Sequence, residues 1–190
     1  MKLLLVLFLL NFDLHSQPHP NILIVYYSAE GHTQQMAEAV ARGARSLQVV
    51  NVRLRTVSEA TNEDVLWADA IIVGTPVYNA NVAPQVQEFI NRWPFENAPL
   101  RNKLGAAFVT GGGISAGEEA TQLSLIRSML IFGMIVVGGP DWTTPFGASA
   151  VTAEQPFGKD PKIVADQFLK KGEALGRRIA ELAQKFHDHR

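Results

Sequence analysis

The sequence predicts an α/β fold in which a five-stranded parallel sheet is covered by helices on both faces. Short apolar runs alternate along the chain with longer segments of helical periodicity, which is the pattern of βαβ units. The runs at 71–73 and 135–137 are apolar throughout, as in central strands that are buried on both faces. A chain of 190 residues is long enough for one domain with a sizeable core.

Each expected element follows from its local pattern. The apolar runs predict strands at 22–27, 48–54, 70–74, 104–110 and 134–138. Helical spacing predicts helices at 33–46, 82–93, 118–130 and 161–186, with a short one at 62–67. The last helix carries an apolar stripe that indicates a core-facing surface. The stretch 139–159 contains proline and glycine and is expected to be irregular.

The composition excludes several classes of protein. With a formal net charge of −1, the chain lacks the excess of positive charge that is typical of proteins that bind nucleic acid. Cysteine is absent, which excludes disulfides, thiol nucleophiles and iron–sulfur clusters held by thiolates. His187 and His189 stand two apart near the end of the chain and are interpreted as a tail, so no metal site is expected. The chemistry must come from a cofactor, a hydroxyl, a carboxylate or a histidine.

The first residues form a separate segment. A basic start at Lys2 precedes eight consecutive apolar residues, 3–10, which are too few to span a bilayer but suit the core of a signal peptide. We therefore expect 1–16 to be a signal peptide and 17–190 to be a single domain. The protein is then exported if this leader is cleaved and cytoplasmic otherwise. The alternative is a buried first strand, a role that the run at 22–27 already fills.

The most informative motif is the polar loop between the first strand and the first helix. It follows the pattern S-x-x-G-x-T, with Ser28 and Thr33 at its ends and Gly31 inside. A helix N-terminus presents free backbone N–H groups and the positive end of the helix dipole. This combination predicts an anion site, most naturally for phosphate. A simple helix cap formed by Ser28 or Thr33 is the alternative.

Two further loops are expected at the same edge of the sheet, because ligands of open parallel sheets lie beyond the carboxyl ends of the strands. The third strand leads into 75–79, which offers an aromatic ring and an amide, and the fourth leads into 110–114, which offers close backbone approach. Alone, Tyr78 could be a surface aromatic residue and the glycines a tight turn. Together the three loops predict a site for a flat aromatic cofactor that bears a phosphate.

The chain resembles the flavodoxin-like flavoproteins, and in particular their FMN-dependent NAD(P)H:quinone oxidoreductase or NADPH-dependent FMN reductase branch. The resemblance covers 21–150 and rests on the stretches 26–33, 70–76, 110–113 and 144–148. It implies a doubly wound, flavodoxin-like sheet of order 2-1-3-4-5 that binds FMN. Flavodoxin is itself an illustration of the rule that ligands bind where strand order reverses.

The resemblance also assigns roles to the three loops. The FMN phosphate would be held by Ser28, Ala29, Glu30, Gly31, His32 and Thr33. The edge of the isoalloxazine ring would be lined by Thr75, Pro76, Val77, Tyr78 and Asn79. The other side of the ring and the ribityl chain would be closed by Thr110, Gly111, Gly112, Gly113 and Ile114. His32 is expected to support the phosphate, since an imidazolium beside a dianion is favourable; an exposed helix-start histidine is the alternative.

For substrate binding, the resemblance indicates two aromatic residues. Phe95 matches a position that lines the quinone pocket in that branch, and Phe132 stands where the branch has a histidine beside the flavin. An imidazole donor over the substrate is therefore missing, and no catalytic side chain is expected. The expected acceptor is a quinone-like or small aromatic molecule, and the donor a nicotinamide nucleotide or a redox protein. A homodimer or tetramer is possible, and the alternative function is a non-enzymatic flavodoxin-type electron carrier.

Overall fold

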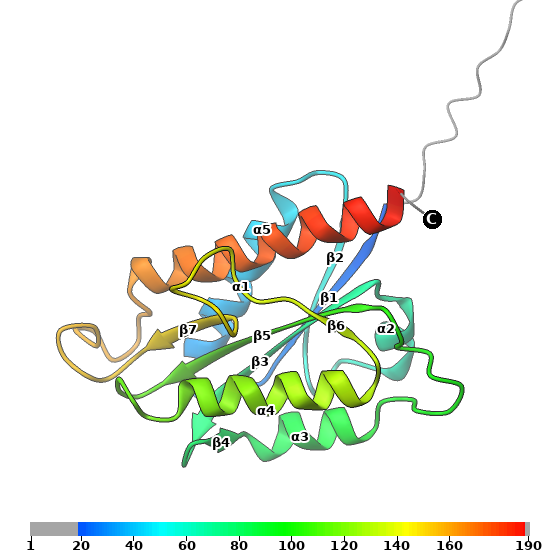
Figure 1. Ribbon diagram of the computed structural model, residues 1–190. Coiled ribbons are helices and arrows are strands. Elements are labelled where there is room, and N and C mark those ends of the chain that lie inside the picture. Colours follow the sequence, from blue (N-terminus) through cyan, green and yellow to red (C-terminus); the bar gives the residue numbers. More distant parts are fainter. Residues whose placement is uncertain (1–18, 189–190) are drawn as a thin grey trace, which may run out of the picture.

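A single parallel sheet forms the centre of the molecule in the computed structural model, which describes residues 19–188. Its strands follow the order β2-β1-β3-β5-β6, and each neighbouring pair is parallel, which confirms the predicted 2-1-3-4-5 topology (Figure 1). The five strands are β1 (Asn21–Tyr26), β2 (Asn51–Thr56), β3 (Ala70–Tyr78), β5 (Leu104–Gly111) and β6 (Ile135–Val136). The predicted signal peptide, 1–16, lies outside the described residues.

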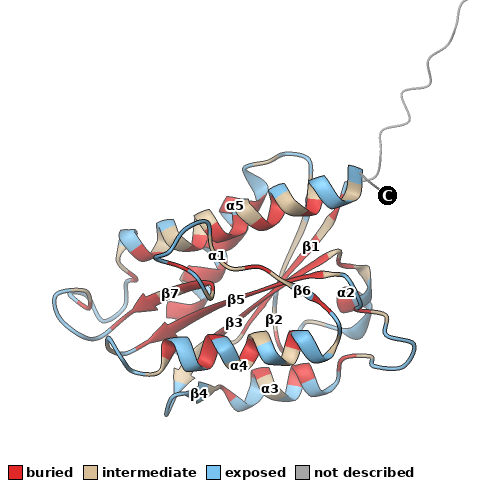
Figure 2. Ribbon diagram, in the orientation of Figure 1, coloured by how far each residue is buried: buried red, intermediate tan, exposed pale blue. Residues whose placement is uncertain are grey.

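Helices cover both faces of this sheet, as Figures 1 and 2 show. One face is covered by α1 (His32–Arg45) and α5 (Asp166–Asp188). The other is covered by α2 (Asn62–Trp67), α3 (Pro84–Asn91) and α4 (Glu118–Ile131). Within 19–188, no helix combines the length and the apolar character that crossing a membrane requires.

The strands supply alternate side chains to two cores. Ile22 and Ile24 of β1 are fully buried against the layer of α1 and α5, while Leu23 and Val25 are fully buried against the opposite layer. A strand directs successive side chains to opposite faces, so a strand covered twice must be apolar at every position. This explains why the continuous apolar runs in the sequence identify the central strands.

The fifth strand position is divided between two short strands, which the sequence did not reveal. β6 pairs with the beginning of β5, and β7 (Ala148–Val151) pairs with the end of β5 through Phe108 and Ala148. The segment expected to be irregular at 139–159 therefore contains a strand. The buried side chains Ala148 and Ala150 are small, so β7 lacks the bulky apolar run by which the other strands were identified.

β3 continues beyond its predicted end and turns back on itself. It forms a short antiparallel hairpin with β4 (Asn81–Val82), in which Tyr78 pairs with Asn81. The two turn residues have positive φ, 50° at Asn79 and 60° at Ala80, as a type I′ hairpin turn requires. The consequence for the site is that Tyr78 sits on a folded hairpin, and not on an open loop.

The short helix α2 is fixed at its N-terminus by the carboxylate of Asp64, which accepts several hydrogen bonds. Thr61 and Asp64 form a capping box, and Arg53 donates to Asp64 at 2.8 Å. Burial acts to raise the pKa of Asp64, but the Thr61 N–H, the Arg53 guanidinium and the Thr61 hydroxyl together lower that pKa below its ordinary value. Asp64 is therefore expected to stabilise the fold only while it is ionised.

Replacing Asp64 by asparagine is expected to lower the free energy of unfolding by about 1 kcal/mol at pH 7, a modest value because Arg53 is partly exposed. The folded-state pKa is lowered, so the contribution is present above pH about 4 and is lost as the pH falls through the folded-state pKa. Urea unfolding of both proteins between pH 3 and pH 7 measures this. A difference that stays constant down to pH 3 would contradict the ionic role.

Candidate functional site

The three predicted loops meet in one pocket of about 270 Å³ at the carboxyl ends of β1, β3 and β5. Most residues assigned to the site from the sequence line this pocket. They are Ser28, Ala29, Glu30, His32, Thr33, Pro76, Val77, Tyr78, Thr110, Gly111 and Gly112. The structure thus brings together residues that are more than 80 positions apart, because parallel strands end at a common edge.

The remaining predicted residues lie around this pocket and do not line it. Gly31 is inside the first loop and shapes its backbone. Thr75 is fully buried and accepts a hydrogen bond from Ala83 N–H at 3.0 Å, so its hydroxyl anchors the start of α3. Asn79 borders a separate hollow beside the β3–β4 hairpin. Gly113 and Ile114 are on the far part of the glycine loop, where Ile114 N–H donates to Glu154.

The first loop offers unpaired backbone donors to the pocket. Gly31 has φ +92°, and its N–H donates to Ser28 Oγ at 3.1 Å. Of the N–H groups from Ala29 to Thr33, that of Gly31 alone has an acceptor within the described chain. The free donors lie at the N-terminus of α1, where the helix dipole is positive, so they suit an anion. No lysine or arginine is among the residues that line the pocket, so this anion would be held by N–H and hydroxyl groups.

Two threonine hydroxyls join the first loop to the third. Thr33 Oγ1 and Thr110 Oγ1 are 2.8 Å apart and buried. One of these hydroxyls donates to the other, so only the hydroxyl that accepts within the pair keeps its O–H free to donate to a ligand oxygen. This contact fixes the start of α1 against the end of β5.

A fourth wall, which sequence reasoning missed, comes from the segment after β7. Thr152, Ala153 and Pro161 line the same pocket. Thr152 donates from both N–H and Oγ1 to Gly111 O, at 2.9 and 3.1 Å, and Ala153 N–H donates to Gly112 O at 3.0 Å. These residues follow β7, a strand that the sequence pattern did not reveal. The available sign of a further pocket residue was the hydroxyl of Thr152, which comes directly after the small apolar residues of β7.

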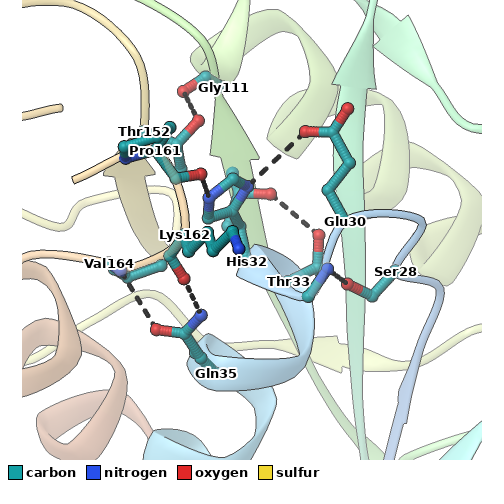
Figure 3. A network of polar contacts seen from close by, with 12 residues as sticks. Ser28, Glu30, His32, Thr33, Gln35, Gly111, Thr152, Pro161, Lys162 and Val164 are labelled. Atoms are coloured by element: carbon teal, nitrogen blue, oxygen red, sulfur yellow. Dashed lines mark hydrogen bonds and ion pairs between the residues drawn. The ribbon is translucent and has the colours of Figure 1, made fainter.

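His32 holds the fourth wall in place, as Figure 3 shows. Its Nε2 is 2.8 Å from Pro161 O, and its Nδ1 is 3.9 Å from a carboxylate oxygen of Glu30. One turn along α1, Gln35 donates to Lys162 O at 2.8 Å and accepts from Val164 N–H at 3.0 Å. The alternative of an exposed helix-start histidine is wrong, since His32 is 9% exposed. Its support of an anion stays a prediction, and one of its ring nitrogens is already used by the wall.

Replacing His32 by alanine is expected to weaken the binding of FMN, the ligand that the sequence resemblance implies, by about fivefold, because one hydrogen bond of about 1 kcal/mol that fixes the pocket wall is lost. Fluorescence titration of the cofactor-free protein with FMN measures the dissociation constant. Gln35→Ala releases the same segment from a residue that does not line the pocket, so it is expected to weaken FMN binding similarly if the loss arises from the wall and not from contact with the ligand. If FMN affinity is the same in His32→Ala and the unsubstituted protein, the role of His32 in the site is wrong.

Tyr78 provides a flat apolar wall beside the anion site. Its side chain is half exposed, at 39%, and lies edge-on to Tyr27, with ring centroids 6.5 Å apart and an interplanar angle of 82°. Burial raises the pKa of Tyr78 first, with further contributions from Tyr27 and from the carboxylate of Glu30. The phenol therefore stays neutral at physiological pH and can contact an aromatic ring. A planar group with an anionic tail matches this arrangement.

Phe95 and Phe132 do not lie in this pocket. Their rings are 5.5 Å apart in a separate apolar hollow beside the C-terminal end of α4. That hollow is next to the start of β5, whereas the anion pocket is at its end, about 20 Å away for a strand of this length. The two predicted substrate residues thus lie next to each other. Within one chain, however, they are far from the three loops that form the anion pocket.

The fold and the pocket define a flavoprotein of the flavodoxin type that binds FMN. The chain belongs to the NADPH-dependent FMN reductase family, whose model matches residues 20–149. It is accordingly an FMN-dependent oxidoreductase. The free N–H groups at the start of α1, with Tyr78 beside them, fit the phosphate and the ring of this cofactor.

Similar proteins include one named flavodoxin and several named NAD(P)H dehydrogenase (quinone). A flavodoxin from Aquifex aeolicus is 35% identical over 179 residues, which cover 89% of this chain and 90% of that protein. A protein named NAD(P)H dehydrogenase (quinone) from Afipia carboxidovorans is 31% identical over 198 residues, which cover 87% of this chain and 98% of the relative.

Solved structures show the same fold. An archaeal flavodoxin gives a TM-score of 0.67 at 24% identity and covers 86% of this chain and 99% of its own. A flavodoxin described as WrbA-like, from Agrobacterium tumefaciens, gives 0.68 at 23% identity and covers 87% of this chain and 98% of its own.

Proposed function

We propose that this protein transfers two electrons from NAD(P)H to a quinone-like acceptor through bound FMN. The observation that carries the proposal is the half-exposed Tyr78 on the same pocket as the free N–H groups of α1. FMN held there would be fixed at its phosphate end. Its ring would be open at the β3–β4 hairpin, where a second flat molecule can approach. The relatives named NAD(P)H dehydrogenase (quinone), 31% identical over most of the chain, support the choice of donor and acceptor.

The residues of the site contribute position and shielding. When bound, FMN supplies the electron chemistry. The free N–H groups of the first loop and one hydroxyl of the Thr33–Thr110 pair would hold its phosphate. The segment that carries Thr152 would close one side of the cofactor, and Tyr78 would form the flat wall of the open side. No nucleophile or general base is required, because donor and acceptor would occupy the same open position in turn.

Steady-state kinetics tests this function. With FMN-loaded protein, NADPH and a soluble quinone, we expect turnover with parallel double-reciprocal lines, since the donor must leave before the acceptor binds. A non-enzymatic carrier, which is favoured by the 35% identity to a flavodoxin, would show a reducible flavin but no turnover with NADPH. That outcome would overturn the proposal.

A role for Phe95 and Phe132 at the acceptor would require a second copy of the chain. Phe95 is 63% exposed, and Ile131 beside it is also exposed, so this apolar end of the molecule can pack against another copy. We therefore propose that any contribution of these two rings to acceptor binding is made across an interface in a homodimer or tetramer. Light scattering of the purified protein tests this, and a monomer would exclude it.

The electron donor depends on the compartment, because nicotinamide nucleotides are not expected outside the cytoplasm. We propose export if residues 1–16 are removed, with a redox protein then replacing the nicotinamide nucleotide as donor. Sequencing the N-terminus of the protein isolated from its native cells decides between the two cases. A start at Met1 in the cytoplasmic fraction would exclude export.

A further inference from the structure

Glu154 makes a contact with the glycine loop that neither the sequence nor the family assignment indicates. Its Oε2 accepts a hydrogen bond from Ile114 N–H at 2.6 Å, a short distance typical of a charge-assisted bond. The same oxygen lies 2.7 Å from the position that a Cβ on Gly113 would occupy, so any side chain at Gly113 would displace it.

The contact lies on the same loop as the pocket lining, two residues beyond Gly112. Gly112, the neighbour of Gly113, lines the pocket, and a Cβ placed there would meet nothing within 4 Å. The backbone of Glu154 is fixed independently, because its N–H donates to Gly112 O at 2.8 Å and its carbonyl accepts from Gly158 N–H at 2.8 Å. A change of the side chain alone therefore leaves the turn intact. The carboxylate holds the loop and places a negative charge on it.

We propose that Glu154 is a positioning residue for FMN, and that its charge makes the bound cofactor harder to reduce. The first part follows from the bond to Ile114, which fixes the loop that closes one side of the pocket. The second follows because a fixed carboxylate opposes further negative charge nearby, as is added when a flavin is reduced to its anionic form. The proposal rests on FMN binding alone, and not on the identity of the donor or the acceptor.

Two variants separate these effects. Glu154→Gln keeps an oxygen that can accept from Ile114 N–H but removes the charge, whereas Glu154→Ala removes both. We expect Glu154→Gln to bind oxidised FMN within about twofold of the unsubstituted protein and to favour reduced over oxidised FMN by about three- to tenfold. This ratio corresponds to a rise of about 14 to 30 mV in the two-electron potential. Glu154→Ala is expected to show the same rise and to bind oxidised FMN about fivefold more weakly.

The matched control is Glu96→Gln, which removes the same charge from an exposed residue at the opposite end of the sheet. Fluorescence titration gives the affinity for oxidised FMN, and an equilibrium titration against a redox dye gives the potential. The proposal is overturned if Glu154→Gln has the same potential as Glu96→Gln, or if Glu154→Ala binds oxidised FMN as tightly as the unsubstituted protein. Neither measurement requires a quinone or NADPH, so a failure of the proposed turnover would leave both results interpretable.

Discussion

Replacing Gly31 by alanine is expected to weaken FMN binding by about tenfold. Gly31 has φ +92°, a left-handed conformation that costs an L-residue about 1–2 kcal/mol. A Cβ at this position would meet nothing within 4 Å, so the effect is conformational and not a steric clash. The free loop can relax away from the strained conformation, and FMN binding must then restore it. A cost of about 1.4 kcal/mol corresponds to a tenfold change in the dissociation constant.

The matched control is Gly133→Ala. Gly133 also has positive φ, +74°, but it ends α4 at the other end of the sheet. The Gly133→Ala protein is expected to have a free energy of unfolding about 1 kcal/mol lower than the unsubstituted protein and an unchanged affinity for FMN. Calorimetric titration with FMN and urea unfolding of both variants measure the two quantities. Equal FMN affinities for Gly31→Ala and Gly133→Ala would show that the geometry of the first loop does not determine binding.

Replacing Gly176 by alanine is expected to lower the free energy of unfolding by about 2 kcal/mol. Gly176 of α5 packs against the backbone of α1, and a Cβ there would lie 1.9 Å from Val40 O. Alanine favours a helix over glycine by about 1 kcal/mol, so propensity alone predicts the opposite sign. The clash is with backbone, which cannot move aside as a side chain could, and overpacking of this kind costs about 1–3 kcal/mol or more.

Gly172→Ala is the control, because it makes the same substitution one turn earlier on α5. Its nearest neighbour would be the Cβ of Ala39 at 3.3 Å, so the contact is tight but tolerable. We expect the unfolding free energy of this variant to stay within about 1 kcal/mol of the unsubstituted protein. Urea unfolding compares the two variants directly. If Gly176→Ala is as stable as Gly172→Ala, close approach of α1 and α5 is not what requires glycine.

Much of the fold could be predicted because its determinants are local. Ile71–Val73 lies in a strand that is buried on both faces, and an unbroken apolar run with β-branched residues is typical of such a strand. α2 begins at Asn62, as predicted, since Thr61 and Asp64 form a capping box that is visible in the sequence. The predicted start of α5 was wrong: the helix begins at Asp166 and not at Pro161, because groups of the preceding residues bond to side chains of α1.

The sequence pattern by itself therefore determined the parallel sheet and the loops that meet at its carboxyl edge, whereas the strand order was implied by the resemblance to flavodoxin-like proteins. The sheet and the loops depend on hydrophobic periodicity and on the rule that parallel strands end together. The tertiary structure alone decided which groups close the pocket. Pro161 reaches His32 across 129 positions, and Glu154 reaches Ile114 across 40. It also separated Phe95 and Phe132 from the three loops. Such contacts follow from how the layers pack, and no local pattern encodes them.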